Sequence, residues 1–166
     1  MKRILLLLMV GGALASGAVR AADFEDPKAL VEALYQPYTQ GRQPIDLASF
    51  YTDGLKAMFA RHRQMEASTG GIGEPLKVAD VRQPEFDPFV DARNYLLFDL
   101  NISDAVVNGD HALVNVSYKN FAHPTELSVS LLKTPEGWKV DDIASMGADQ
   151  HWLLSWLLTY DPLGTD

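Results

Sequence analysis

Apolar and polar residues alternate in three or four short runs between residues 101 and 143. Alternation with a period of two is typical of strands with one buried face. The runs are separated by Asn108-Gly109, His123-Pro124 and Pro135-Glu136-Gly137, which are turn sequences, so we expect an antiparallel meander. The principal core should lie on the sheet face that carries Val114, Val116, Val129, Leu131 and Trp138.

The turn at Asn108-Gly109 leaves two registers open. A two-residue loop would turn Ile102 away from the face of Val116. A three-residue loop with a glycine bulge would place Leu100 and Ile102 on that face. Burial specifies the register wherever one face of a sheet is covered, so we favour the three-residue loop.

Helical periodicity precedes the meander. Asp26 followed by Pro27 predicts the start of a helix, because an acidic cap and a proline at the first helical position both favour that end. Apolar residues then recur about every four positions as far as Tyr38. Asp46 should cap a second helix, and Thr52-Asp53-Gly54 predicts a break or a new cap before a further helical run. A sheet with one apolar face needs cover, and these helices can supply it, which predicts an α+β fold.

A last helix is predicted from Asp149 to Tyr160. Trp152, Trp156 and Tyr160 fall on one stripe with leucines on both flanks, so the helix is apolar around most of its circumference. Such a helix is either buried on two sides or offers a surface to another subunit. We therefore take the three aromatic residues as candidate interface residues, for a homodimer or for a protein partner in the cell envelope.

Residues 70–91 are rich in glycine and proline and contain a possible edge strand from Leu76 to Val81. The stretch carries no second apolar core, which indicates a connection within one domain and not a boundary between two. The predicted organisation is a leader at residues 1–21 and a single α+β domain at residues 22–166.

The leader is predicted from its three-part pattern. Lys2 and Arg3 form a basic start, residues 4–10 are an unbroken apolar run, and Val19 and Ala21 are small residues before a cleavage point. The apolar run is too short to span a membrane. We expect cleavage after Ala21 and a periplasmic or secreted protein with no membrane span afterwards.

Composition removes several classes of function. The chain has a net charge of -8, and loss of the basic leader makes the remainder more acidic still, so nucleic acid is a poor candidate partner. There are no cysteines, which excludes disulfides, thiolate metal sites, a cysteine nucleophile and N-terminal lipidation.

Catalytic motifs are missing from the sequence. The four histidines stand alone, without a second ligand at metal-binding spacing, so no metal and no cofactor is predicted. No G-x-S-x-G elbow, dinucleotide fingerprint or phosphate-binding loop is present. The many aromatic residues, Tyr51 and Phe59 among them, are either core residues, which we favour, or the lining of a pocket.

One carboxylate stands out from the strand pattern. The turn between Thr134 and Gly137 should pair Val129 with Asp142, which would point Asp142 toward the apolar face. A carboxylate there could lie at the mouth of a cavity, with Tyr38 or Tyr118 as its hydrogen-bond donor. We take Asp142 as a candidate catalytic residue. The candidate ligand-binding residues are Tyr38, Tyr118, Trp138 and Asp142.

Several short motifs resemble a known family. They are Asp87-Pro88-Phe89, residues 91–94, residues 107–110 and 112–118, and Trp138 to Ile143. In their order they resemble the secreted bacterial family called domain of unknown function 3828, within the cystatin-like superfamily of nuclear-transport-factor-2-like domains. The resemblance implies a roll in which helices pack on a curved antiparallel sheet. It also implies a location in the cell envelope, but no activity.

Two classes of function remain open. The favoured class is a non-catalytic periplasmic domain that binds a small apolar ligand or a protein. The other is an isomerase-like or dehydratase-like enzyme that uses Asp142 with a tyrosine donor, because rolls of the resembled type host such enzymes. That second argument comes from fold analogy alone, which is a weak reason to assign chemistry.

Overall fold

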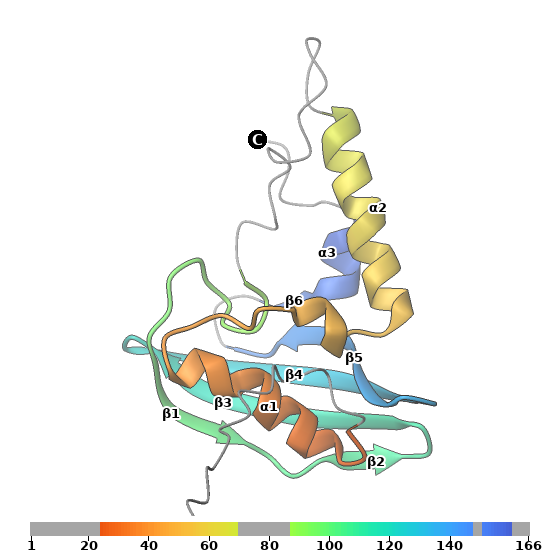
Figure 1. Ribbon diagram of the computed structural model, residues 1–166. Helices are drawn as coiled ribbons and strands as arrows, with labels where there is room; N and C mark the ends of the chain where they lie inside the picture. Colours follow the sequence, from red (N-terminus) through yellow and green to blue (C-terminus); the bar gives the residue numbers. More distant parts are fainter. Residues whose placement is uncertain (1–23, 70–86, 148–150, 161–166) are drawn as a thin grey trace, which may run out of the picture.

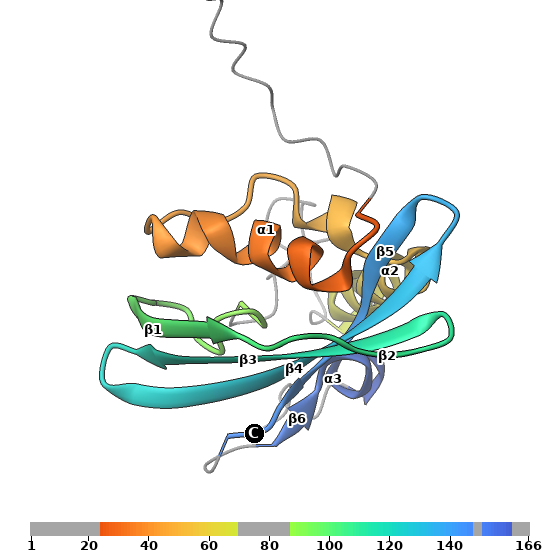
Figure 2. The same ribbon diagram turned by 90° about the horizontal axis from the view of Figure 1, so that it is seen from below.

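In the part of the chain that the structure describes, six antiparallel strands form one sheet, and α1 crosses its apolar face (Figures 1 and 2). The structure is a computed structural model that describes residues 24–69, 87–147 and 151–160. The predicted leader at residues 1–21 and the possible strand at residues 76–81 lie outside these ranges. The elements are α1 (Pro27–Thr39), the 3-10 helix η1 (Leu47–Phe50), α2 (Asp53–Thr69), β1 (Leu97–Ile102), β2 (Val106–Asn108), β3 (His111–Asn120), β4 (His123–Thr134), β5 (Gly137–Ser145), β6 (Trp152–Leu153) and α3 (Leu154–Tyr160).

The sheet has the strand order β1-β3-β4-β5-β6, and β2 also pairs with β3. The long β3–β4 hairpin is its centre, and Figure 2 shows the strands curving beneath α1. These features confirm the predicted α+β class with helices on a curved antiparallel sheet. The finer assignment to a nuclear-transport-factor-2-like roll stays a prediction.

The core lies where the strand alternation places it. Val114, Val116, Val129, Leu131 and Trp138 are all buried, as are the apolar residues of one α1 face. Helix α1 starts as predicted, because the Asp26 side chain accepts a hydrogen bond from the Lys28 amide at 2.9 Å. Asp46 likewise caps η1, and the Thr52 hydroxyl accepts from the Leu55 amide where α2 begins.

The first hairpin confirms one part of its prediction and corrects another. Ile102 pairs with Val116 and packs against the core, as the favoured register required. The loop itself is shorter than predicted, because Asn108 pairs with His111 across a two-residue turn. β1 and β2 are separate strands, so the register of one does not fix the register of the other.

Strand β5 contains an irregularity that overturns the predicted position of Asp142. Leu131 pairs with Val140 as expected, but Ser130 then pairs with Asp142 and Val129 with Ile143. One extra residue, Asp141, lies between these pairs, and an inserted residue reverses which face every later side chain occupies. The predicted pairing of Val129 with Asp142 is therefore wrong. Ile143 takes the buried position on the apolar face.

The C-terminal segment is only partly the predicted helix. Trp152 and Leu153 form the short strand β6 beside Ala144 and Ser145, and the helix starts at Leu154. Leu154 and Leu158 are buried. Figure 2 shows α3 on the opposite side of β5 from α1.

Candidate functional site

A tight turn at Asp87–Ala92 organises the candidate site. The Asp87 carboxylate accepts a hydrogen bond from the Phe89 amide at 2.9 Å, and the Asp87 backbone pairs with that of Ala92. Aspartate commonly closes a turn in this way. The turn drives Phe89 and Val90 fully into the core. It thereby fixes the carboxylate of Asp87 beside the core aromatic residues.

Phe89 is the centre of a continuous aromatic cluster. Its ring meets Tyr35 edge-on at 6.2 Å and lies nearly parallel to Tyr51 at 6.1 Å between centroids. Tyr51 in turn stacks on Phe59 of α2 at 5.4 Å and 9°. The hydroxyls of Tyr35 and Tyr118 both donate to the Phe89 carbonyl, at 2.8 and 3.3 Å. Such contacts fix ring positions as well as burying area.

An edge contact of β5 brings α2 beside the turn. Tyr51 forms a parallel bridge with Val140, and the Thr52 amide donates to the Val140 carbonyl at 2.9 Å. The Thr52 hydroxyl also donates to the Asp141 carboxylate at 2.9 Å. The residue inserted in β5 thus helps to anchor the start of α2.

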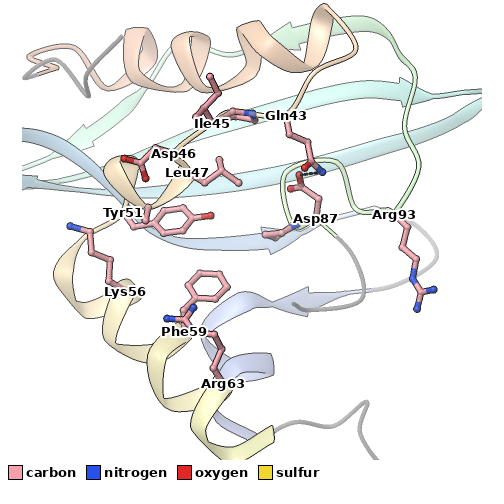
Figure 3. A pocket seen from close by; sticks show the side chains of 13 residues that line it. Gln43, Ile45, Asp46, Leu47, Tyr51, Lys56, Phe59, Arg63, Asp87 and Arg93 are labelled. Carbon is pink, nitrogen blue, oxygen red and sulfur yellow. Dashed lines mark hydrogen bonds between the residues drawn. The ribbon is translucent and has the colours of Figure 1, made fainter. Parts of the chain in front are cut away.

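Between these parts lies an open pocket of about 720 Å³ (Figure 3). Figure 3 shows the 43–48 segment on one side, α2 on the other and the Asp87 turn at the end. The lining residues are Gln43, Pro44, Ile45, Asp46, Leu47, Ala48, Tyr51, Lys56, Phe59, Arg63, Asp87, Pro88 and Arg93. The pocket therefore joins apolar and aromatic residues with three basic and two acidic side chains.

Asp87 is the most perturbed carboxylate among the described residues of the pocket. Burial raises its pKa above the ordinary value, and this outweighs the hydrogen bonds from the Tyr38 hydroxyl and the Phe89 amide, which lower it. The Tyr38 hydroxyl donates to Asp87 Oδ2 at 2.7 Å, and Gln43 Nε2 lies 3.5 Å from the same oxygen. The carboxylate is thus partly desolvated but held by donors from the chain.

Two tyrosines beside Asp87 are locked in the neutral form. Burial, together with the charge of Asp87, raises the pKa of both Tyr38 and Tyr51. Each hydroxyl therefore remains a proton donor throughout the physiological range. The arrangement offers the Asp87 carboxylate as acceptor and the Tyr51 phenol as donor at one end of the pocket, because the Tyr38 hydroxyl already donates to Asp87.

Of the predicted site residues, Tyr38 and Tyr118 meet at the Asp87 turn, whereas Asp142 and Trp138 hydrogen-bond elsewhere. Neither tyrosine predicted as a donor to Asp142 bonds to it, because the Tyr38 hydroxyl donates to Asp87 and the Tyr118 hydroxyl to the Phe89 carbonyl. Asp142 itself accepts from the amide and hydroxyl of Ser155, at 3.0 and 2.5 Å. Trp138 is buried elsewhere, where its indole N–H donates to the Glu25 carbonyl at 3.1 Å. Of the predicted set, Tyr38 hydrogen-bonds directly to a residue that lines the pocket, Asp87.

The candidate interface residues Trp152 and Trp156 lie in different surroundings. Trp152 donates to Asp91 Oδ1 at 2.9 Å, which joins β6 to the turn. Trp156 is 52% exposed on α3, and the side chain of Tyr160 lies outside the described part of the chain. Their role in a protein interface stays a prediction. In the ranges that the structure describes, no helix combines the length and apolar character that a membrane span requires.

Asp87 is not among the predicted site residues, although Asp87-Pro88-Phe89 carries part of the family resemblance. The signal was the Asp-Pro pair before an apolar Phe-Val pair, which is a turn that inserts into a core. The pocket could not be read from spacing, because its residues come from positions 43–63 and 87–93 of the chain.

Comparisons with known proteins add little. No protein-family model matches the chain, and no curated protein sequence matches it. Among solved structures, the chain is similar to one in the type VI native effector-immunity complex Tae3-Tai3 from Ralstonia pickettii. The match has 16% identity and a TM-score of 0.44, and it covers 76% of this chain and 99% of that one. A similarity this low supports no inference about function.

Proposed function

We propose that the protein is an exported, periplasmic binding domain of the nuclear-transport-factor-2-like roll type. Its ligand is a small organic molecule that occupies the pocket between η1, α2 and the Asp87 turn. The leader pattern at residues 1–21 supports export, and the family resemblance supports the roll and the envelope location.

One observation carries the binding proposal, namely the stacked pair Tyr51 and Phe59 at the pocket wall. Ligand sites are typically concave, with apolar and aromatic walls and a few placed polar groups. Leu47 and Pro44 extend the apolar wall, and Asp87 supplies a fixed polar group. The volume of about 720 Å³ falls in the usual range for such sites.

The test is calorimetric titration of the mature protein with 2-naphthoate, a flat aromatic probe. We expect saturable binding that weakens about tenfold or more in Phe59→Ala, because the probe loses a stacking partner. Phe98→Ala is the matched control, since Phe98 is an exposed phenylalanine outside the pocket. Equal affinity in wild type and Phe59→Ala, or no saturable binding at all, would contradict the proposal.

A second candidate is an isomerase-like enzyme, favoured by the partly desolvated carboxylate of Asp87 beside two neutral phenols. Asp87, not Asp142, would then be the base that removes a proton next to a substrate carbonyl. Conversion of 3-cyclohexenone to its conjugated isomer, followed by ultraviolet absorbance, tests this chemistry. A rate above buffer that Asp87→Asn abolishes would support the enzyme. A wild-type rate equal to buffer would remove it.

A further inference from the structure

The pocket carries positive charge on one wall, which points to a particular class of ligand. Lys56, Phe59 and Arg63 are spaced by three and four positions on α2, so they share one face of the helix. All three line the pocket, and Arg93 adds a third cation from the segment after the Asp87 turn. Figure 3 shows Lys56, Phe59 and Arg63 following one another along α2.

The acidic residues of the pocket already accept hydrogen bonds from the chain. Asp46 accepts from the Ser49 amide at 3.3 Å as the cap of η1. Asp87 accepts from Tyr38 and Phe89. These contacts hold both carboxylates in structural roles, and among the described residues neither of them forms an ion pair with Lys56 or Arg63.

Lys56 does have an ion partner, but a weak one. Its ammonium lies 3.0 Å from Asp53, whose side chain is fully exposed, within one turn of the same helix. Exposed pairs of this kind contribute little to stability and exchange readily with other anions. Lys56 can therefore turn to an anion in the pocket at small cost.

Apolar surface at the rim complements these cations. Ile45 lines the pocket and is fully exposed. Together with Leu47 and Phe59 it gives the pocket an apolar part, which suits an apolar ligand. The two features together select a molecule with a flat apolar body and a charged group at one end.

We infer that the ligand of this pocket is a flat apolar molecule that bears an oxyanion, which Arg63 and Lys56 bind while Tyr51 and Phe59 hold the apolar body. This inference rests on the proposed binding function. Guanidinium groups bind carboxylate and phosphate oxygens in bidentate geometry. The proposed class of ligand therefore includes both carboxylates and phosphates.

The test compares three probes on the mature protein by calorimetry, namely 2-naphthoate, 2-naphthyl phosphate and neutral 2-naphthalenemethanol. We expect both anions to bind about tenfold or more tightly than the alcohol. Arg63→Gln should remove that preference, and Arg63→Lys should restore part of it. Lys119→Gln is the control, because Lys119 is an exposed cation on β3 that pairs with Asp99. Tighter binding of the phosphate or of the carboxylate identifies which oxyanion the site prefers.

The two proposals fail in different ways. If all three probes bind with equal affinity and Arg63→Gln changes none of them, the oxyanion inference is wrong and the binding function stands. If the anions lose affinity equally in Arg63→Gln and Lys119→Gln, the attraction is unspecific charge and the inference is again overturned. If no probe binds, the binding function fails and the inference falls with it.

Discussion

At the scale of single residues, Asp87 is the group whose environment is most informative. It is partly buried, it lines the pocket, and burial raises its pKa despite two donors from the chain. A carboxyl with a raised pKa in the folded state binds its proton more tightly there than in the unfolded chain. Protonation therefore favours folding, and ionisation disfavours it.

The consequence is a pH-dependent stability that one substitution should remove. As pH rises from the unfolded reference of about 3.9 through the folded pKa of Asp87, the native state binds more protons than the unfolded chain, so this residue's contribution to stability falls. Asp87→Asn keeps an acceptor for Tyr38 but has no charge. The unfolding free energy of this variant minus that of wild type should therefore be more positive at pH 7 than at pH 4. Urea unfolding at the two pH values measures the difference.

Asp104→Asn provides the opposite control. Lys28 binds Asp104 at 2.7 Å on the surface and lowers the pKa of that carboxyl. Removing it should therefore give no relative gain in stability as pH rises. A difference between Asp87→Asn and wild type that is the same at both pH values would show that the Asp87 carboxyl is not perturbed.

At the scale of elements, the sequence correctly predicted helix starts and buried strand faces, which depend on local patterns. It mispredicted the strand position at which one inserted residue breaks the alternation. The Asp26-Pro27 start of α1 and the buried face of β3 follow from capping and alternation, which are local. The inserted Asp141 in β5 has no such signal, because a bulge is fixed by what packs on both sides of the strand. Asp142 was misplaced for that reason. The α2 wall of the pocket was predicted as helix, but its position opposite Asp87 depends on tertiary contacts.

The hydrogen bonds between Asp142 and Ser155 should stabilise the attachment of α3 to β5. Asp142 accepts both the amide and the hydroxyl of Ser155 in the first turn of α3, where helix amides have no partner of their own. Ser155→Ala removes the hydroxyl bond to the carboxylate and should cost about 1–2 kcal/mol of unfolding free energy. Thr159→Ala, on the exposed side of the same helix, should change it by less than about 0.5 kcal/mol. Urea unfolding measures the loss of stability in both variants. Equal losses would contradict a stabilising role of the hydrogen bonds between Asp142 and Ser155.

At the scale of the whole molecule, stability depends on the apolar face of the sheet that α1 covers. Val116 is buried at the centre of β3 and pairs with Leu127 of β4. Val116→Asp places an unpaired charge there and should cost several kcal/mol, which is comparable to the total stability of a small domain. Leu113→Asp, on the other face of the same strand and partly exposed, should stay folded. Circular dichroism shows whether each variant folds. A folded Val116→Asp variant would contradict the assignment of this sheet face to the core.

The predicted export is also a whole-molecule property. Cleavage after Ala21 should leave a mature chain that starts at Ala22 in the periplasmic fraction. N-terminal sequencing of the fractionated protein reads this directly. Recovery of the chain with Met1 in the membrane fraction would overturn the predicted leader.

The central claim is that a small ligand occupies the pocket beside Asp87, and the location of a bound probe tests it most directly. Amide chemical shifts of the ¹⁵N-labelled mature protein, followed during titration with 2-naphthoate, report that location. The account predicts saturable shifts that are largest at Leu47, Tyr51, Phe59 and Arg63, which line the pocket. Shifts confined to β2 and the exposed end of β3, or shifts that do not saturate, would contradict it.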